Sequence, residues 1–218
     1  MVLLGGFWLL NFYRENLSGA GPAIKPPPGD ITEDINTTGM PLTLPPGFSI
    51  EIFAKDLPGV RVMVFDPMGN LWVSQTSEGS VSLLTLEDGV VSSKTSVLRD
   101  LKNPHGLAFD PANPLTLYIA EENKITKINT YTDDEARPTI TSLPEGSGHY
   151  TRTIGFGPDK KIYVSIGSSC NVCHEQDDRR AKIFSMNADG TNLKEYARGL
   201  RNTVFFTWHP GTNVMWGT

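Results

Sequence analysis

Short apolar runs, alternating or continuous and separated by turn-forming clusters, fill the chain from about residue 44 onward. Period-two alternation indicates half-buried β-strands, and clusters of Asp, Gly, Pro and Ser are typical of the turns between them. The sequence therefore predicts an all-β fold. The predicted strands cover 48–54, 60–65, 71–75, 80–86, 90–97, 106–109, 116–120, 124–129, 139–143, 153–156, 161–166, 181–186 and 193–197, then one from 204 and one over 215–218.

The strand runs recur as copies of one pattern. In each copy an aromatic residue stands two positions before a proline, and a polar turn and a second strand run follow. The aromatic residues are Phe65, Phe109, Phe156 and Trp208, separated by about 44, 47 and 52 residues. This period suits four-stranded propeller blades or some solenoids. We predict about four blade units, the last incomplete. Because a propeller closes on itself to avoid open strand edges, the pattern predicts a fragment of a larger ring.

Three regions of different composition make up the chain. Residues 1–18 begin with an apolar stretch of about a dozen residues, whereas a membrane-spanning helix needs roughly 20. They lack a basic n-region and a cleavage site, so they indicate a truncated signal or membrane anchor or, alternatively, the tail of a misassigned reading frame. Residues 19–45 are rich in Pro, Gly and Thr and predict an extended linker. Residues 46–218 form the predicted partial propeller domain.

Composition and motifs narrow the function. A net charge of -5 and a pI near 5.4 argue against a nucleic-acid partner, which requires a basic surface. The chain contains no Gly-rich phosphate loop, Walker motif or G-x-S-x-G elbow, so nucleotide-dependent and serine-hydrolase functions lack support. It also contains no calcium loop of the D-x-D-x-D-G kind, and we assign no metal ligand.

Three polar segments stand at the same place in the repeat, just before an inner strand: 103–105, 149–152 and 198–202. In a propeller, such segments meet at one end of the central funnel. A histidine there can remove a proton from an alcohol while arginines hold an anionic cofactor. A structural hydrogen-bonding role is the alternative for any single histidine, but the shared repeat position favours His149 as a catalytic candidate.

Two cysteines lie three residues apart in the segment Cys170-Asn171-Val172-Cys173-His174. The pattern C-x-x-C-H is the sequence motif for covalent haem attachment. Here it falls in a predicted blade loop, so a local disulfide or a pair of thiols is the alternative that we favour. A disulfide this short closes a small loop and adds modest stability in an oxidising compartment.

The segments GHYTRTIGFGPDKKIYVSIGSSCNVC, DDRRAKIFSMNADGTN, ARGLRN and WHP together resemble the glucose/sorbosone dehydrogenase family, in its sorbosone-type branch. The resemblance covers roughly residues 44–218 and is dense over 149–202. It implies a six-bladed β-propeller that is exported and oxidises sugars or related aldehydes with pyrroloquinoline quinone (PQQ) and calcium.

The resemblance also implies roles for particular residues. His149 holds the place of the family's general base, ahead of a G-P-D-x-x-I-Y strand, and Arg201 and Asn202 match the pair that contacts the quinone. Arg152 and His105 are secondary candidates for cofactor contact. The family's calcium ligands come from later blades, so we expect them beyond Thr218.

We therefore predict part of a PQQ-dependent sugar or aldehyde dehydrogenase that passes electrons to an external acceptor. It would work in the periplasm or outside the cell, where the N-terminus could anchor it to the membrane. The fragment alone would be inactive. A lactonase-type propeller is one alternative, but it would need Glu, Asn and Asp ligands on one central cation. A non-catalytic binding propeller is the other, since this fold serves many functions.

Overall fold

The computed structural model describes residues 36–218 except 46, 133–135 and 147. The predicted apolar segment 1–18 and most of the predicted linker 19–45 lie outside the described residues. The chain divides into two compact units, residues 1–53 and Ala54–Thr218. In the described part of the first unit, Asn36 forms an isolated parallel bridge with Ile50. The predicted strand over 48–54 is wrong, because a strand needs a partner along its whole edge and here only Ile50 pairs.

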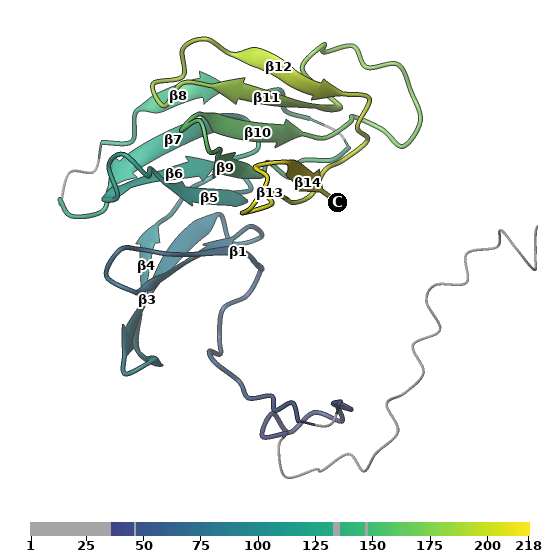
Figure 1. Cartoon of the computed structure of the whole chain (residues 1–218). Coiled ribbons are helices and arrows are strands. Elements are labelled where there is room, and N and C mark those ends of the chain that lie inside the picture. The colour runs from purple at the N-terminus through teal and green to yellow at the C-terminus, as the bar shows by residue number, and fades with distance from the viewer. Residues whose placement is uncertain (1–35, 46, 133–135, 147) are drawn as a thin grey trace, which may run out of the picture. The chain divides into compact units, whose positions relative to one another are not determined.

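The second unit consists of antiparallel sheets whose strands follow one another in sequence order (Figure 1). The first sheet contains β1 (Val60–Phe65), β2 (Leu71–Gln75), β3 (Ser80–Glu87) and β4 (Val90–Leu98). The second contains β5 (Gly106–Phe109), β6 (Thr116–Ala120), β7 (Lys124–Asn129) and β8 (Thr139–Ser142). The third contains β9 (Ile154–Phe156), β10 (Ile162–Ile166), β11 (Lys182–Met186) and β12 (Lys194–Arg198). A two-stranded sheet of β13 (Phe206–Trp208) and β14 (Met215–Gly217) follows.

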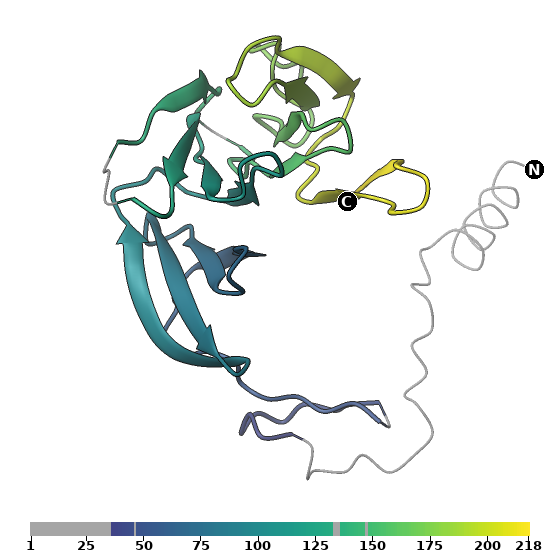
Figure 2. The same ribbon diagram turned by 60° about the vertical axis from the view of Figure 1, so that its left-hand side comes forward.

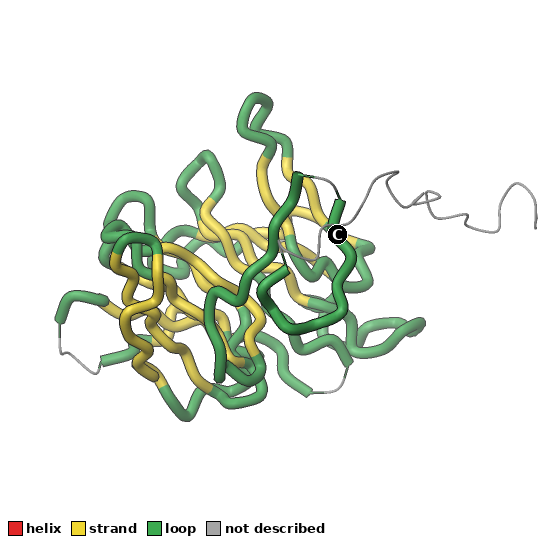
Figure 3. Tube along the Cα trace, turned by 90° about the horizontal axis from the view of Figure 1, so that it is seen from below, coloured by secondary structure: helices red, strands yellow, loops and turns green. Residues whose placement is uncertain are grey.

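The described residues form strands and loops throughout (Figure 3). Every strand predicted after residue 59 is present, with bounds that differ by no more than two residues. The all-β fold with four-stranded units is confirmed, while a count of six blades stays a prediction. Among these residues there is no helix of the length and apolarity needed to cross a bilayer.

The strands of each four-stranded sheet differ in how far they are buried. The second strands β2, β6 and β10 are buried at every position. The outer strands β4 and β12 are mostly exposed and carry Ser, Thr, Lys and Glu. This difference follows from position, since the second strand is paired on both edges and covered on both faces, whereas the outer strand has one free edge.

The recurring aromatic residue joins each sheet to the one before it. It lies edge-on against an aromatic side chain from the second strand of the preceding sheet, with ring centroids 5.1–6.3 Å apart, which is a favourable geometry for aromatic pairs. The three pairs are Trp72 with Phe109, Tyr118 with Phe156, and Tyr163 with Trp208. The repeat seen in the sequence therefore encodes the contact between successive sheets.

Apolar side chains fill the space between successive sheets. One buried cluster joins the first and second sheets, and a second cluster joins the second and third. The inner strands β1, β5 and β9 lie side by side as a result (Figures 1 and 2). Because each inner strand runs in the same sense through its sheet, the segments that precede the inner strands gather at one end of the unit.

Candidate functional site

Backbone bonds connect the segments that precede successive inner strands. The amide of Gly106, at the start of β5, donates to the carbonyl of Arg152 just before β9, at 2.9 Å. The hydroxyl of Thr153 in turn donates to the carbonyl of Val204, just before β13. The three polar segments identified in the sequence therefore follow one another in space along one end of the sheets.

His149 and Asn202 approach each other at Gly167, which follows β10. A Cβ atom placed on Gly167 would lie 2.5 Å from the Cβ of His149 and 2.5 Å from Oδ1 of Asn202. Only glycine leaves room for both side chains at this distance. The hydroxyl of Thr151 also donates to Oδ1 of Asn202 at 3.4 Å. Sequence reasoning missed Gly167, although a glycine that ends a buried strand is a signal of close backbone approach.

The position of His149 is set through its backbone. Its amide donates to the carbonyl of Ser168 at 2.9 Å, and its own carbonyl accepts a bond from Arg152 at 2.8 Å. Its Nε2 atom is buried and has no hydrogen-bond partner among the described residues. A buried polar atom without a partner is unfavourable, so this nitrogen is the part of the turn that a bound molecule would satisfy.

Arg152 is fully buried beneath this turn. Its guanidinium donates to the carbonyls of His149, Thr151, Glu122 and Pro144, at 2.7–3.1 Å. Burial, and then the nearby charge of Arg180, lower the pKa of Arg152 to about 10, so it remains charged at neutral pH. Because these bonds go to the protein's own backbone, Arg152 fixes the His149 turn, and its predicted contact with a cofactor stays a prediction.

His105 lies at the start of the second sheet and is also fully buried. Its ring lies against Phe205 in a tilted arrangement, with centroids 5.7 Å apart and an interplanar angle of 37°, and neither ring nitrogen has a partner among the described residues. Burial, and then the charge of Arg61, lower the pKa of His105 to about 4, so the ring is neutral at pH 7. Its predicted contact with a cofactor likewise stays a prediction.

Glu122 is a further residue that the sequence reasoning missed. It is buried just after β6, and its carboxylate accepts bonds from Asn103 Nδ2 at 2.8 Å and from the amide of Gly146 at 2.9 Å. Burial alone would raise the pKa of Glu122, but these two bonds lower it below its ordinary value. Glu122 therefore ties together the segments that lead to His105 and His149. The pair of glutamates after a buried strand was its only signal in the sequence.

Arg201 and Asn202 lie in the turn between β12 and β13. The carbonyl of Arg201 accepts a bond from the amide of Ser168 at 2.8 Å, so this turn is joined to the segment that also holds His149. Arg201 is exposed, and its Nη2 atom donates to Oδ1 of Asn171. Both Arg201 and Asn202 line a cavity of about 520 Å³ next to β12 and β14, whose lining does not include His149.

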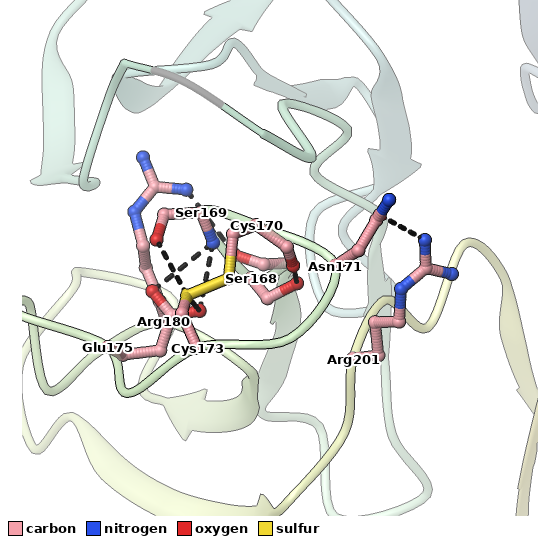
Figure 4. The surroundings of a disulfide bond; sticks show 9 residues. Ser168, Ser169, Cys170, Asn171, Cys173, Glu175, Arg180 and Arg201 are labelled. Carbon is pink, nitrogen blue, oxygen red and sulfur yellow. Dashed lines mark hydrogen bonds between the residues drawn. A yellow bond between two sulfur atoms is a disulfide. The ribbon is translucent and has the colours of Figure 1, made fainter.

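Cys170 and Cys173 form a disulfide in the loop between β10 and β11 (Figure 4). The disulfide uses both sulfur atoms that covalent haem attachment through the C-x-x-C-H motif would require. Of the alternatives that the sequence left open, the structure therefore shows the local disulfide.

The geometry thus brings three groups to neighbouring loops: the imidazole nitrogen of His149, which has no partner within the described part of the chain, the amide of Asn202 and the exposed guanidinium of Arg201. An imidazole can accept a proton, while an amide and a guanidinium can hold an oxygen-rich anion. These functions are those of a site that binds an anionic group and removes a proton from a second molecule.

Three solved structures resemble the chain and are described in their titles as follows. The holo form of the pyranose dehydrogenase PQQ domain from Coprinopsis cinerea is 22% identical over 72% of this chain and 42% of that one, with a TM-score of 0.63. The iodide structure of the Trichoderma reesei family AA12 carbohydrate-active enzyme is 25% identical over 77% and 47%, with a TM-score of 0.65. The PQQ-bound aldose sugar dehydrogenase from Streptomyces coelicolor is 21% identical over 77% and 58%, with a TM-score of 0.63.

This chain spans about half the length of these structures. Comparison with curated proteins gave no significant match. Two of these structures are described as a pyranose dehydrogenase PQQ domain and a PQQ-bound aldose sugar dehydrogenase, and the sorbosone-type branch stays a prediction for this chain. The model of the family described as TrAA12-like matches residues 42–218, which is most of the sequence. The chain therefore belongs to the TrAA12-like family.

Proposed function

We propose that the protein contributes to PQQ-dependent oxidation of a sugar or a related aldehyde, with His149 as the general base. The observation that carries this proposal is the buried Nε2 atom of His149, which has no hydrogen-bond partner among the residues that the structure describes and lies in a turn joined to Asn202. Membership of the TrAA12-like family and the PQQ-binding neighbours support it.

The residues present suit the cofactor chemically. PQQ carries several carboxylates and two quinone oxygens, so it requires cationic and neutral donors. Arg201 is exposed and charged, Asn202 offers an amide, and Gly167 allows Asn202 and His149 to approach closely. We propose that Arg201 and Asn202 hold the cofactor. Calcium remains part of the proposal, and we assign no calcium ligand in this sequence.

Oxidation of an alcohol removes a hydroxyl proton and a hydride from the same carbon centre. When bound, PQQ supplies the two-electron acceptor for the hydride. Nε2 of His149 accepts the hydroxyl proton. Arg152 and Ser168 hold the backbone of His149 from two sides, which keeps the imidazole in one place during this transfer.

The two alternatives receive less support from these residues. A lactonase would need carboxylate and amide ligands around one cation, whereas the loops here present a histidine and an arginine. A pure binding module would not need a proton acceptor. An external electron acceptor, a location in the periplasm or outside the cell, and an N-terminal membrane anchor remain parts of the proposal.

The test uses the full-length gene product with calcium, titrated with PQQ and then assayed for reduction of a dye by a panel of aldoses. We expect saturable binding and sugar-dependent reduction. His149→Ala should keep PQQ binding and lose about 100- to 10,000-fold in turnover, the usual contribution of a general base. His174→Ala, an exposed histidine of a neighbouring loop, is the matched control. A well-folded protein that binds no PQQ would overturn the proposal, and full turnover by His149→Ala would overturn the role of that residue.

A further inference from the structure

The disulfide loop between β10 and β11 touches the predicted cofactor residue Arg201. Cys170 and Cys173 close a ring that contains Asn171 and Val172. The side chain of Asn171 points out of this ring toward Arg201, and its Oδ1 atom accepts a bond from Nη2 of the guanidinium (Figure 4). This bond joins two loops that lie 30 residues apart in the sequence.

The base of the ring is fixed by a second set of bonds. The hydroxyl of Ser168 donates to the carbonyl of Cys170 at 2.6 Å. The amide of Ser169 donates to both carboxylate oxygens of Glu175, at 2.9 and 3.2 Å. Since the amide of Ser168 also donates to the carbonyl of Arg201, the ring is joined to the Arg201 turn through the backbone and through a side chain.

The same loop lies against the residue that precedes His149. A Cβ placed on Gly148 would be 2.3 Å from the carbonyl carbon of Ser169, and Gly148 has a φ of +89°, which favours glycine. The loop that carries the ring thus contacts both the residue before His149 and the guanidinium of Arg201. Nothing in the proposed reaction yet uses it.

We propose that the Cys170–Cys173 ring is a positioning device that holds Asn171 where it orients the guanidinium of Arg201 for an anionic cofactor. This inference rests on the proposed function, because it assumes that Arg201 binds PQQ. An exposed arginine has many rotamers, and ordering it on binding costs conformational entropy. A protein that orders the side chain before the ligand arrives binds more tightly.

The chemistry of the acceptor suits this purpose. Asn171 accepts the bond through a neutral amide oxygen, so it orients Arg201 without cancelling its charge. A carboxylate in the same place would form an ion pair and reduce the attraction of Arg201 for an anionic ligand. Asparagine therefore combines orientation with an unneutralised guanidinium.

The test is a double-mutant cycle of PQQ affinity in the full-length gene product, measured by binding and independent of turnover. We expect Asn171→Ala to weaken binding about fivefold, the size expected when one long side chain must be ordered on binding instead of beforehand. In an Arg201→Met background the same change should have no further effect. Val172→Ala is the matched control, since Val172 belongs to the same ring and is 96% exposed.

A second measurement requires no cofactor. In Cys170→Ser/Cys173→Ser, hydrogen–deuterium exchange should rise in peptides over 198–205 as well as 168–176, because the ring no longer fixes the neighbouring turn. Unchanged exchange over 198–205 would overturn the inference. So would wild-type affinity in Asn171→Ala, or an equal loss with and without Arg201. Failure of the wild-type protein to bind PQQ would instead overturn the proposed function, and with it the cofactor role of the ring.

Discussion

Replacing Arg152 with methionine tests whether one buried guanidinium holds the His149 turn. Methionine keeps much of the apolar volume but removes the charge and all the donors. The bonds to the carbonyls of Glu122 and Pro144 are buried, whereas those to His149 and Thr151 are partly exposed. The variant therefore leaves two acceptors that water cannot reach and two that it can.

The expected loss of folding free energy in Arg152→Met follows from these four acceptors. A buried acceptor left without a donor costs about 1–3 kcal/mol, and a hydrogen bond whose acceptor regains water costs roughly 1 kcal/mol or less. Removing the charge recovers part of its desolvation cost, whose presence is indicated by the lowered pKa of Arg152. We expect Arg152→Met to lower the free energy of unfolding by about 3 kcal/mol, a large share of the 5–15 kcal/mol typical of a native protein.

The assay is urea denaturation followed by tryptophan fluorescence. Arg152→Lys should lower the free energy of unfolding by about half as much as Arg152→Met does. An ammonium donates from one atom and cannot reach acceptors on several sides. Arg137→Met is the control, since Arg137 is exposed and, among the described residues, bonds to the carbonyl of Arg99, and it should change stability by less than about 0.5 kcal/mol. A loss below about 1 kcal/mol in Arg152→Met would refute the assigned role.

Two further predictions concern the close packing around Gly167 and the loss of folding stability at acidic pH. Gly167→Ala should displace His149 or Asn202, destabilise the protein by about 1–3 kcal/mol through overpacking and weaken PQQ binding, as measured by denaturation and titration. The folded-state pKa of His105 is lowered to about 4, below the unfolded value of 6.5, so its contribution to stability is complete above pH 6.5 and is lost as the pH falls toward 4. His105→Phe should remove this dependence, roughly 3 kcal/mol across the interval, in denaturation curves recorded at several pH values.

Each of these two predictions has an outcome that would contradict it. Gly211→Ala is the control for crowding, because a Cβ there meets its nearest atom at 3.4 Å. If Gly167→Ala were as stable as Gly211→Ala, the close approach of His149 and Asn202 would be wrong. For the pH prediction, parallel stability profiles of the wild-type protein and His105→Phe between pH 4 and 6.5 would show that His105 is not buried in its neutral form.

Local patterns predicted most of the fold. Strands after residue 59 were placed to within two residues, because alternation and turn residues act over a few positions. The hairpin turn at Asp88 and Gly89, both with positive φ, is an example of such local coding. The strand predicted over 48–54 failed for the opposite reason. Its residue types alternate, but a strand also depends on a partner that the pattern does not specify, and the apolar side chains of Phe48, Ile52 and Phe53 are exposed.

The candidate site was only partly predictable. The shared repeat position correctly grouped the segment of His149 with that of Arg201 and Asn202. It gave no indication that Arg152 would be enclosed by carbonyls, or that Gly167 would separate His149 from Asn202. These features depend on which atoms meet when the sheets pack, and the residue types alone allow many such pairings.

The amino-acid sequence by itself determined the strands and the repeat of the aromatic residue, since each arises from a short periodic pattern. The tertiary structure decided which polar groups are buried, which remain without a partner and which loops touch. The bond between Asn171 and Arg201 spans 30 residues, and that between Arg152 and Glu122 also spans 30. Contacts at such separations form only when the sheets pack in sequence around common inner strands, and that packing is a property of the whole unit.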